Sequence, residues 1–229
     1  MQPLDGAYSR VKRAGKHLAY LNRRVNILSK SICESVYINR QPQKFILENG
    51  REINGFLCDA TARIEPVPHI IKILIGEIVY NLRAALDYLV YELARLDSGK
   101  IIDNTQFLIE ESPEGFSKNS GYRLKGINDK HVKIIEGLQP YNGCNWTRIL
   151  RELSNPDKHR ELTISNPCIC LFAQDSTKAN LVNESADIND SVSVHLNFRC
   201  GKSIVDVDTL KQLKCEVAQA LHLFDSEFK

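Results

Sequence analysis

Residues 4–32 read LDGAYSRVKRAGKHLAYLNRRVNILSKSI and form the most regular stretch of the chain. Apolar residues recur in it at alternating steps of three and four, which is the spacing of one face of an α-helix. The stretch therefore predicts a long helix over residues 4–34. Its apolar stripe consists of Leu4, Ala7, Val11, Ala14, Leu18, Leu21, Val25, Leu28 and Ile32.

Another helix must cover this stripe, either from the same chain or from a second copy in a homodimer. A parallel self-paired coiled coil usually carries opposite charges at the positions that flank the stripe. Here those positions hold Arg10, His17 and Arg24 on one side and Tyr8 and Gly15 on the other, so the basic residues have no acidic residues opposite them. We expect packing within the chain, with the homodimer as the alternative.

Further apolar stripes predict the other helices. The widest one follows Pro68 and stops near Gly99, so we expect this helix to occupy the centre of the core. The predicted spans are 68–97, 129–138, 147–155 before Pro156, and 208–228 with Asp208 as the N-cap.

Alternating residues predict strands in two clusters, 44–64 and 163–207. The pair Asn49-Gly50 predicts a hairpin with a two-residue type I′ turn. A strand over 192–199 has 168–172 and 204–207 as its expected neighbours. Because strands cluster instead of alternating with helices, the pattern predicts an α+β fold. We expect one domain, 1–229, in which a bundle of three long helices plus short helices carries an antiparallel β-sheet on one side.

The composition is that of a globular protein, with 229 residues, 25% of them charged, and a formal net charge of +2. No run approaches the ~18 apolar residues of a membrane span, and the first residues lack the apolar core of a signal peptide. We therefore expect a cytoplasmic protein without a membrane partner. The seven cysteines show no paired ligand spacing, which favours free thiols and no metal or other cofactor.

Charge is concentrated near the N-terminus, where residues 1–44 hold nine Lys and Arg but only two acidic residues. One interpretation is a solvated helix face. The other is a surface that follows the phosphates of a nucleic acid, with Arg10, Arg13, Lys16 and Arg23 at its centre.

Two polar clusters could carry chemistry. Arg83 and Asp87 lie one turn apart on the predicted helix 68–97, either as an ion pair that fixes helix packing or as part of a site. The turn after helix 147–155 displays Asp157, His159 and Arg160. Asp157 and His159 stand two positions apart, which fits no zinc spacing, so we expect no metal there.

Three segments together resemble a known pattern: Asn81-Leu82-Arg83-Ala84-Ala85-Leu86-Asp87-Tyr88, then Gln139-Pro140-Tyr141, then Asn155-Pro156-Asp157-Lys158-His159-Arg160. They resemble an uncharacterised bacterial family with the pattern N-L-R-x-x-L-D-H…Q-P-Y…N-x-D-K-H-R. Its arginine helix is similar in turn to that of the HEPN superfamily of prokaryotic defence and toxin–antitoxin systems. Many HEPN proteins are metal-independent ribonucleases with an R-x(4–6)-H motif, and their active site commonly forms across a homodimer.

The resemblance implies that Arg83 stabilises a phosphate in the transition state, but the motif's histidine is missing. Histidine is required at 88, 89 or 90, and the chain has Tyr88 at the first of these positions. A tyrosine with a pKa near 10 is a poor proton shuttle at neutral pH. Either the activity is lost, or His159 is the general acid and base.

Under that second hypothesis Arg160 helps to bind the phosphate, and Asp87 or Asp157 orients a partner. The resemblance implies RNA as the ligand and identifies no protein partner or antitoxin. Two other interpretations stay open: a noncatalytic binding or regulatory module, and an enzyme of another class that uses the turn at Asp157 and His159.

Overall fold

The computed structural model forms two compact units. The first consists of residues 1–24, 68–165 and 197–229, and the second of residues 25–67 and 166–196. Within these ranges, the structure describes residues 3–63, 66–157, 168–171, 192–195, 197–200 and 203–228. The single domain expected from the sequence stays a prediction, which one cooperative unfolding transition would support.

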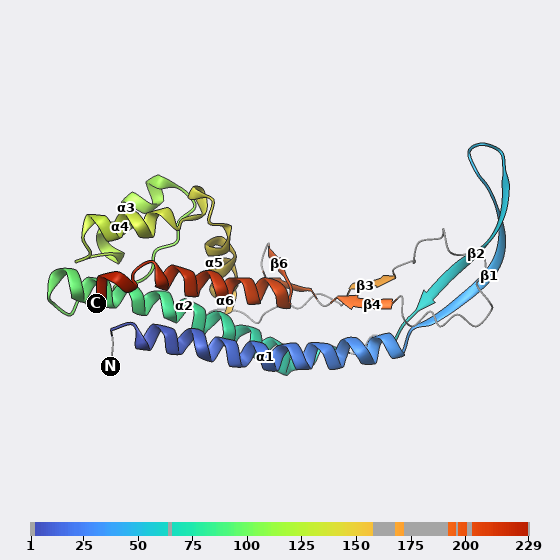
Figure 1. Cartoon of the computed structure of the whole chain (residues 1–229), viewed down its shortest axis with the longest axis horizontal. Helices are drawn as coiled ribbons and strands as arrows, with labels where there is room; N and C mark the ends of the chain where they lie inside the picture. The colour runs from blue at the N-terminus through green and yellow to red at the C-terminus, as the bar shows by residue number, and fades with distance from the viewer. Residues whose placement is uncertain are drawn as a thin grey trace. The chain divides into compact units, whose positions relative to one another are not determined.

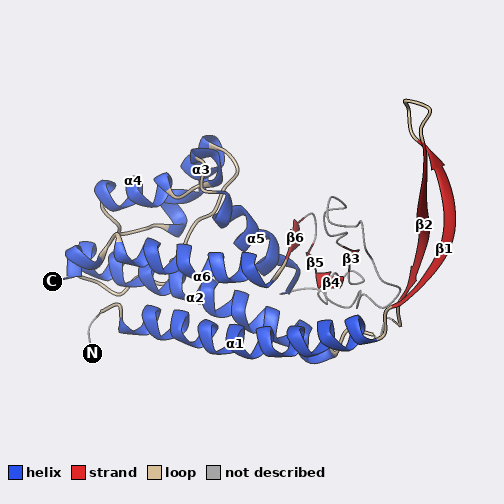
Figure 2. Ribbon diagram, turned by 45° about the vertical axis from the view of Figure 1, so that its right-hand side comes forward, coloured by secondary structure: helices blue, strands red, loops and turns tan. Residues whose placement is uncertain are grey.

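Three long helices build the first unit, as predicted (Figure 1). They are α1 (Asp5–Glu34), of which residues up to 24 belong to this unit, α2 (His69–Ser98) and α6 (Val207–His222). Both views place α2 beside α1 and α6, and its stripe from Ile71 to Ala94 is buried (Figure 2). The expected central position of the helix that carries Arg83 is therefore confirmed.

The stripe of α1 is covered within the chain, as expected. On the α2 side, His17 lies 3.9 Å from Glu77, and on the α6 side the Tyr8 hydroxyl lies 2.9 Å from His222 Nδ1. Gly15 lies against Lys214 of α6. Leu4, Ala7, Val11, Ala14, Leu18 and Leu21 of this unit are all buried.

Short helices complete the first unit, and two of them differ from the sequence prediction. The helix α3 over Pro113–Arg123 was not predicted, and α5 extends through Pro156, which was expected to end it. The helix ends one residue after this proline, at Asp157. The others are α4 (Asp129–Gly137) and the 3₁₀ helices η1 (Pro140–Asn142) and η4 (Asp225–Phe228).

The start and end of α6 also correct the prediction of a helix over 208–228. Its N-cap is Asp206, whose carboxylate accepts hydrogen bonds from the Thr209 backbone N–H and hydroxyl, both at 2.7 Å. Asp208 is already inside the helix, where it pairs with Lys211. The α-helix ends at His222, and the single turn η4 follows.

The strands are antiparallel and pair two by two among the described residues. In the second unit β1 (Tyr37–Ile46) pairs with β2 (Glu52–Thr61), and β3 (Cys168–Leu171) pairs with β4 (Val192–His195). In the first unit β5 (Phe198–Cys200) pairs with β6 (Ser203–Val205), and this small hairpin lies against α5 and α6. The predicted strand 192–199 is thus two strands with two different partners.

The hairpin of β1 and β2 forms where Asn49-Gly50 predicts it, but with a different turn. The backbone N–H of Gly50 donates to the Leu47 carbonyl at 2.8 Å, and the loop is Glu48–Gly50. Gly50 has φ +77°, while Asn49 keeps a negative φ. This is a three-residue loop closed by a left-handed glycine, in place of the type I′ pair.

No described helix is both long and apolar enough to cross a membrane.

Candidate functional site

Arg83 and Asp87 hold the backbone of Phe107 between them. Arg83 Nη2 donates to the Phe107 carbonyl, and the Phe107 N–H donates to Asp87 Oδ1 at 2.9 Å. The two side chains pair with each other at 3.5 Å, and the Arg83 side chain is only 11% exposed. The expected ion pair therefore exists and fixes the segment after α2 against this helix.

Gln139 of the second motif holds the same segment. Its side chain is buried; Nε2 donates to the Leu108 carbonyl at 2.9 Å, and Oε1 accepts from the Glu110 N–H at 2.8 Å. Two motifs more than fifty positions apart thus converge on residues 107–110, each bonding one N–H and one carbonyl of this segment. Buried backbone groups need such partners when no neighbouring strand supplies them.

A polar pocket of about 190 Å³ opens beside this fixed segment. Three arginines line it, each from a different helix: Arg83 from α2, Arg123 from α3 and Arg151 from α5. We call it the arginine pocket. Its lining is completed by Gln106, Phe107, Leu108, Ile109, Glu110 and Ser154.

The arginine pocket has an excess of positive charge. Burial lowers the pKa of Arg83, and nearby Arg123 acts in the same direction, whereas Asp87 opposes them. An arginine nevertheless stays charged at neutral pH. Arg151 donates to Glu111 at 3.3 Å. Among the described residues that line the pocket, Glu110 is the one acidic residue, and it accepts a hydrogen bond from Asn119. Such a pocket favours an anion, and guanidinium groups suit phosphate oxygens in particular.

Tyr88 faces a different neighbour from Arg83. Arg10 of α1 donates to the Tyr88 hydroxyl at 2.9 Å, and its guanidinium lies 5.2 Å from the Tyr88 ring centroid and 5.8 Å from that of Tyr80. Arg10 also donates to the buried Asn81 of the first motif. Tyr88 is thus joined to α1, while Arg83 and Asp87 are joined to Phe107.

The other residues predicted for nucleic-acid binding lie on the outer face of α1. Arg13, Lys16 and Arg23 are exposed, and none of them forms an ion pair with another described residue. Arg10 differs because α2 engages it. His159, Arg160 and the side chain of Asp157 lie outside the described residues, so their predicted roles remain predictions.

Sequence reasoning missed Arg123, Arg151 and Ser154. No spacing could have joined them to Arg83, because α3, α5 and α2 meet only in the folded chain. It also missed a buried cluster at His131. His131 Nδ1 lies 2.8 Å from Asp97 Oδ2, its Nε2 lies 3.2 Å from Glu227 Oε2, and its side chain is 2% exposed.

No protein-family model, curated protein or solved structure matches this chain.

Proposed function

We propose that this chain is a HEPN-like bacterial protein that binds RNA and holds one phosphate of the RNA in the arginine pocket. The observation that carries the proposal is the convergence of Arg83, Arg123 and Arg151 from three helices on one pocket of about 190 Å³. That volume accommodates a phosphate group. The exposed row of Arg13, Lys16 and Arg23 on α1 would add the electrostatic attraction that single-stranded RNA binding uses.

The finer form of the proposal is a metal-independent ribonuclease of a cytoplasmic defence or toxin–antitoxin system. In this form Arg83 stabilises the charge on the phosphate and His159 moves the proton. One described feature favours it: α5 lines the arginine pocket with Arg151 and Ser154, and His159 follows Ser154 by only five positions in the chain. A binding module that does not cleave RNA is the alternative.

Two arginines of α5 provide a matched test of RNA binding. Arg148 and Arg151 both pair with Glu111, at 3.0 and 3.3 Å, but only Arg151 lines the arginine pocket. Loss of one charged hydrogen bond to phosphate weakens binding by about 10-fold or more. Fluorescence anisotropy with a labelled single-stranded RNA should therefore show weaker binding for Arg151→Ala and wild-type binding for Arg148→Ala. Equal affinities of the two variants would contradict the proposed pocket.

Cleavage is tested separately with the same RNA in the presence of EDTA, so that no metal contributes. If the chain is a ribonuclease, the wild-type protein should cleave the RNA. His159→Ala should still bind the RNA but should not cleave it. Binding without cleavage by the wild-type protein would assign the chain to the noncatalytic alternative.

A further inference from the structure

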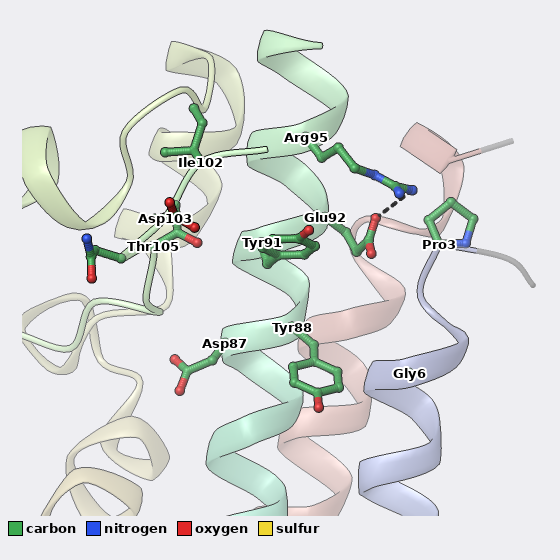
Figure 3. A pocket seen from close by; sticks show the side chains of 11 residues that line it. Pro3, Gly6, Asp87, Tyr88, Tyr91, Glu92, Arg95, Ile102, Asp103 and Thr105 are labelled. Carbon is green, nitrogen blue, oxygen red and sulfur yellow. Dashed lines mark ion pairs between the residues drawn. The ribbon is translucent and has the colours of Figure 1, made fainter. Parts of the chain in front are cut away.

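A second and larger pocket lies on the exposed face of α2. Its volume is about 610 Å³, within the range of small-molecule sites. The start of α1 forms one wall and the segment after α2 forms the other, with the rings of Tyr88 and Tyr91 between them on successive turns of α2 (Figure 3). We call it the tyrosine pocket. Its lining residues are Pro3, Gly6, Asp87, Tyr88, Tyr91, Glu92, Arg95, Ile102, Asp103, Asn104 and Thr105.

The lining suits a flat ring whose edge donates hydrogen bonds. Tyrosine rings are platforms on which bases stack. The polar part of the lining is rich in acceptors: Asp103 and Thr105 lie on the wall opposite Gly6 (Figure 3). Arg95 is the one cation among the described residues of the lining, and it pairs with Glu92 at 2.9 Å. Asp87 is engaged by Arg83 and by the Phe107 N–H, so Asp103 is the carboxylate of the lining that disfavours a phosphate here and favours an amino group.

The tyrosine pocket adjoins the arginine pocket through a single ion pair. Asp87 lines the first and Arg83 lines the second, and their side chains lie 3.5 Å apart. Residues 102–105 border one pocket, and the next residues of the same segment border the other. A chain that places a phosphate at Arg83 therefore has a neighbouring place for a base.

The walls of the tyrosine pocket are held in place. A Cβ at Gly6 would lie only 3.1 Å from Cδ2 of Tyr88, so α1 approaches this ring as closely as a glycine permits. Asn104 has φ +64°, a left-handed conformation that few residues other than glycine adopt. Ile102 lies over Gly126, where a Cβ would overlap its Cδ1.

We infer that the tyrosine pocket binds one unstacked base of the RNA, and that it selects a base with an amino group on its edge. This inference rests on the proposed function, because the RNA phosphate in the arginine pocket brings the base to Tyr88 and Tyr91. Cytosine presents an amino group where uracil presents a carbonyl oxygen. The carboxylate of Asp103 accepts from the first and repels the second.

Oligocytidine and oligouridine of equal length test this selection, because both bases are pyrimidines and they differ on one edge, at the group on position 4 and at N3. Anisotropy titrations should give a dissociation constant for oligouridine that is about 10-fold higher or more, as for loss of a hydrogen bond to a charged group. Asp103→Asn should bring the two constants together, because an amide also donates to the uracil oxygen. Asp103 is exposed, so this substitution leaves the core intact.

Tyr91→Ala should weaken binding of both oligomers by about 5-fold or more through lost stacking. Tyr37→Ala is the control, because Tyr37 is an exposed tyrosine outside the pocket and belongs to β1 of the second unit. Cytidine 5′-monophosphate should compete only at a much higher concentration than the oligomer. Competition at equal concentration would overturn the RNA chain as the ligand and assign the pocket to a free nucleotide.

The outcomes separate this inference from the proposed function. RNA binding that depends on Arg151, with equal constants for both oligomers and no effect of Tyr91→Ala, would overturn the base pocket and leave the function standing. Absence of binding to either oligomer would overturn both.

Discussion

The hydrogen bond from Phe107 to Asp87 can be separated from the ion pair between Asp87 and Arg83. In the wild-type chain the Phe107 nitrogen lies 2.9 Å from Asp87 Oδ1. In Asp87→Asn the amide oxygen can still accept this hydrogen bond, but the negative charge is lost. The pair with Arg83 is long at 3.5 Å, the Asp87 side chain is 31% exposed, and the buried Arg83 keeps its hydrogen bond to the Phe107 carbonyl, so the loss should be about 1 kcal/mol. Asp87→Ala removes both interactions and leaves the Phe107 N–H without its acceptor, which costs about 2–3 kcal/mol in total.

Thermal unfolding followed by circular dichroism measures this difference. For a chain of this size about 1 kcal/mol corresponds to roughly 2–4 °C, so Asp87→Ala should melt about 4–12 °C below the wild-type protein. Asp87→Asn should stay within about 4 °C of it. Equal melting temperatures for the two variants would refute the reasoning, because the acceptor for Phe107 would then contribute nothing.

Three further measurements test other parts of the first unit. His131→Phe replaces the imidazole with an apolar aromatic ring and removes its contacts to two carboxylates, and should lower the free energy of unfolding by about 2–4 kcal/mol in urea titrations. Hydrogen bonds, first from Lys130 and then from His131, hold the pKa of Glu227 below its ordinary 4.5, so their stabilisation is present above that pH and is lost as the pH falls further. The difference in melting temperature between wild type and Glu227→Gln should therefore shrink from pH 6 to pH 3, and a constant difference would contradict it. Asp206→Ala should cost about 1 kcal/mol as a lost N-cap, whereas Asp208→Ala should be nearly neutral.

The long helices could be predicted because each repeats its apolar stripe over many turns. The stripes of α1 and α2 alone define which faces are buried and that α2 is central. The short helix α3 could not be found this way, since Phe116 is its one buried residue. Only its start leaves a local signal: Ser112 caps the helix by accepting from Gly115 N–H, and Pro113 follows it.

The predicted boundary between the last strand and the last helix was wrong, because the same apolar alternation continues from one element into the other. Val205 and Val207 both continue an apolar alternation, but the strand β6 ends at the first and α6 begins at the second, with Asp206 as the cap between them. In the same way Arg83 and Asp87 could be paired from the sequence, while their shared partner could not. Phe107 reaches them only because residues 107–110 return along α2, which no spacing along the chain encodes.

Gly126 controls a part of the tyrosine pocket without lining it. It has φ +83°, so any other residue there is strained, and a side chain at this position would displace Ile102 from the pocket wall. Directed evolution of the ligand selectivity proposed for this pocket should therefore include this position among the sites to be randomised. A library restricted to the lining residues would leave unchanged the close backbone approach at Gly126 that positions Ile102.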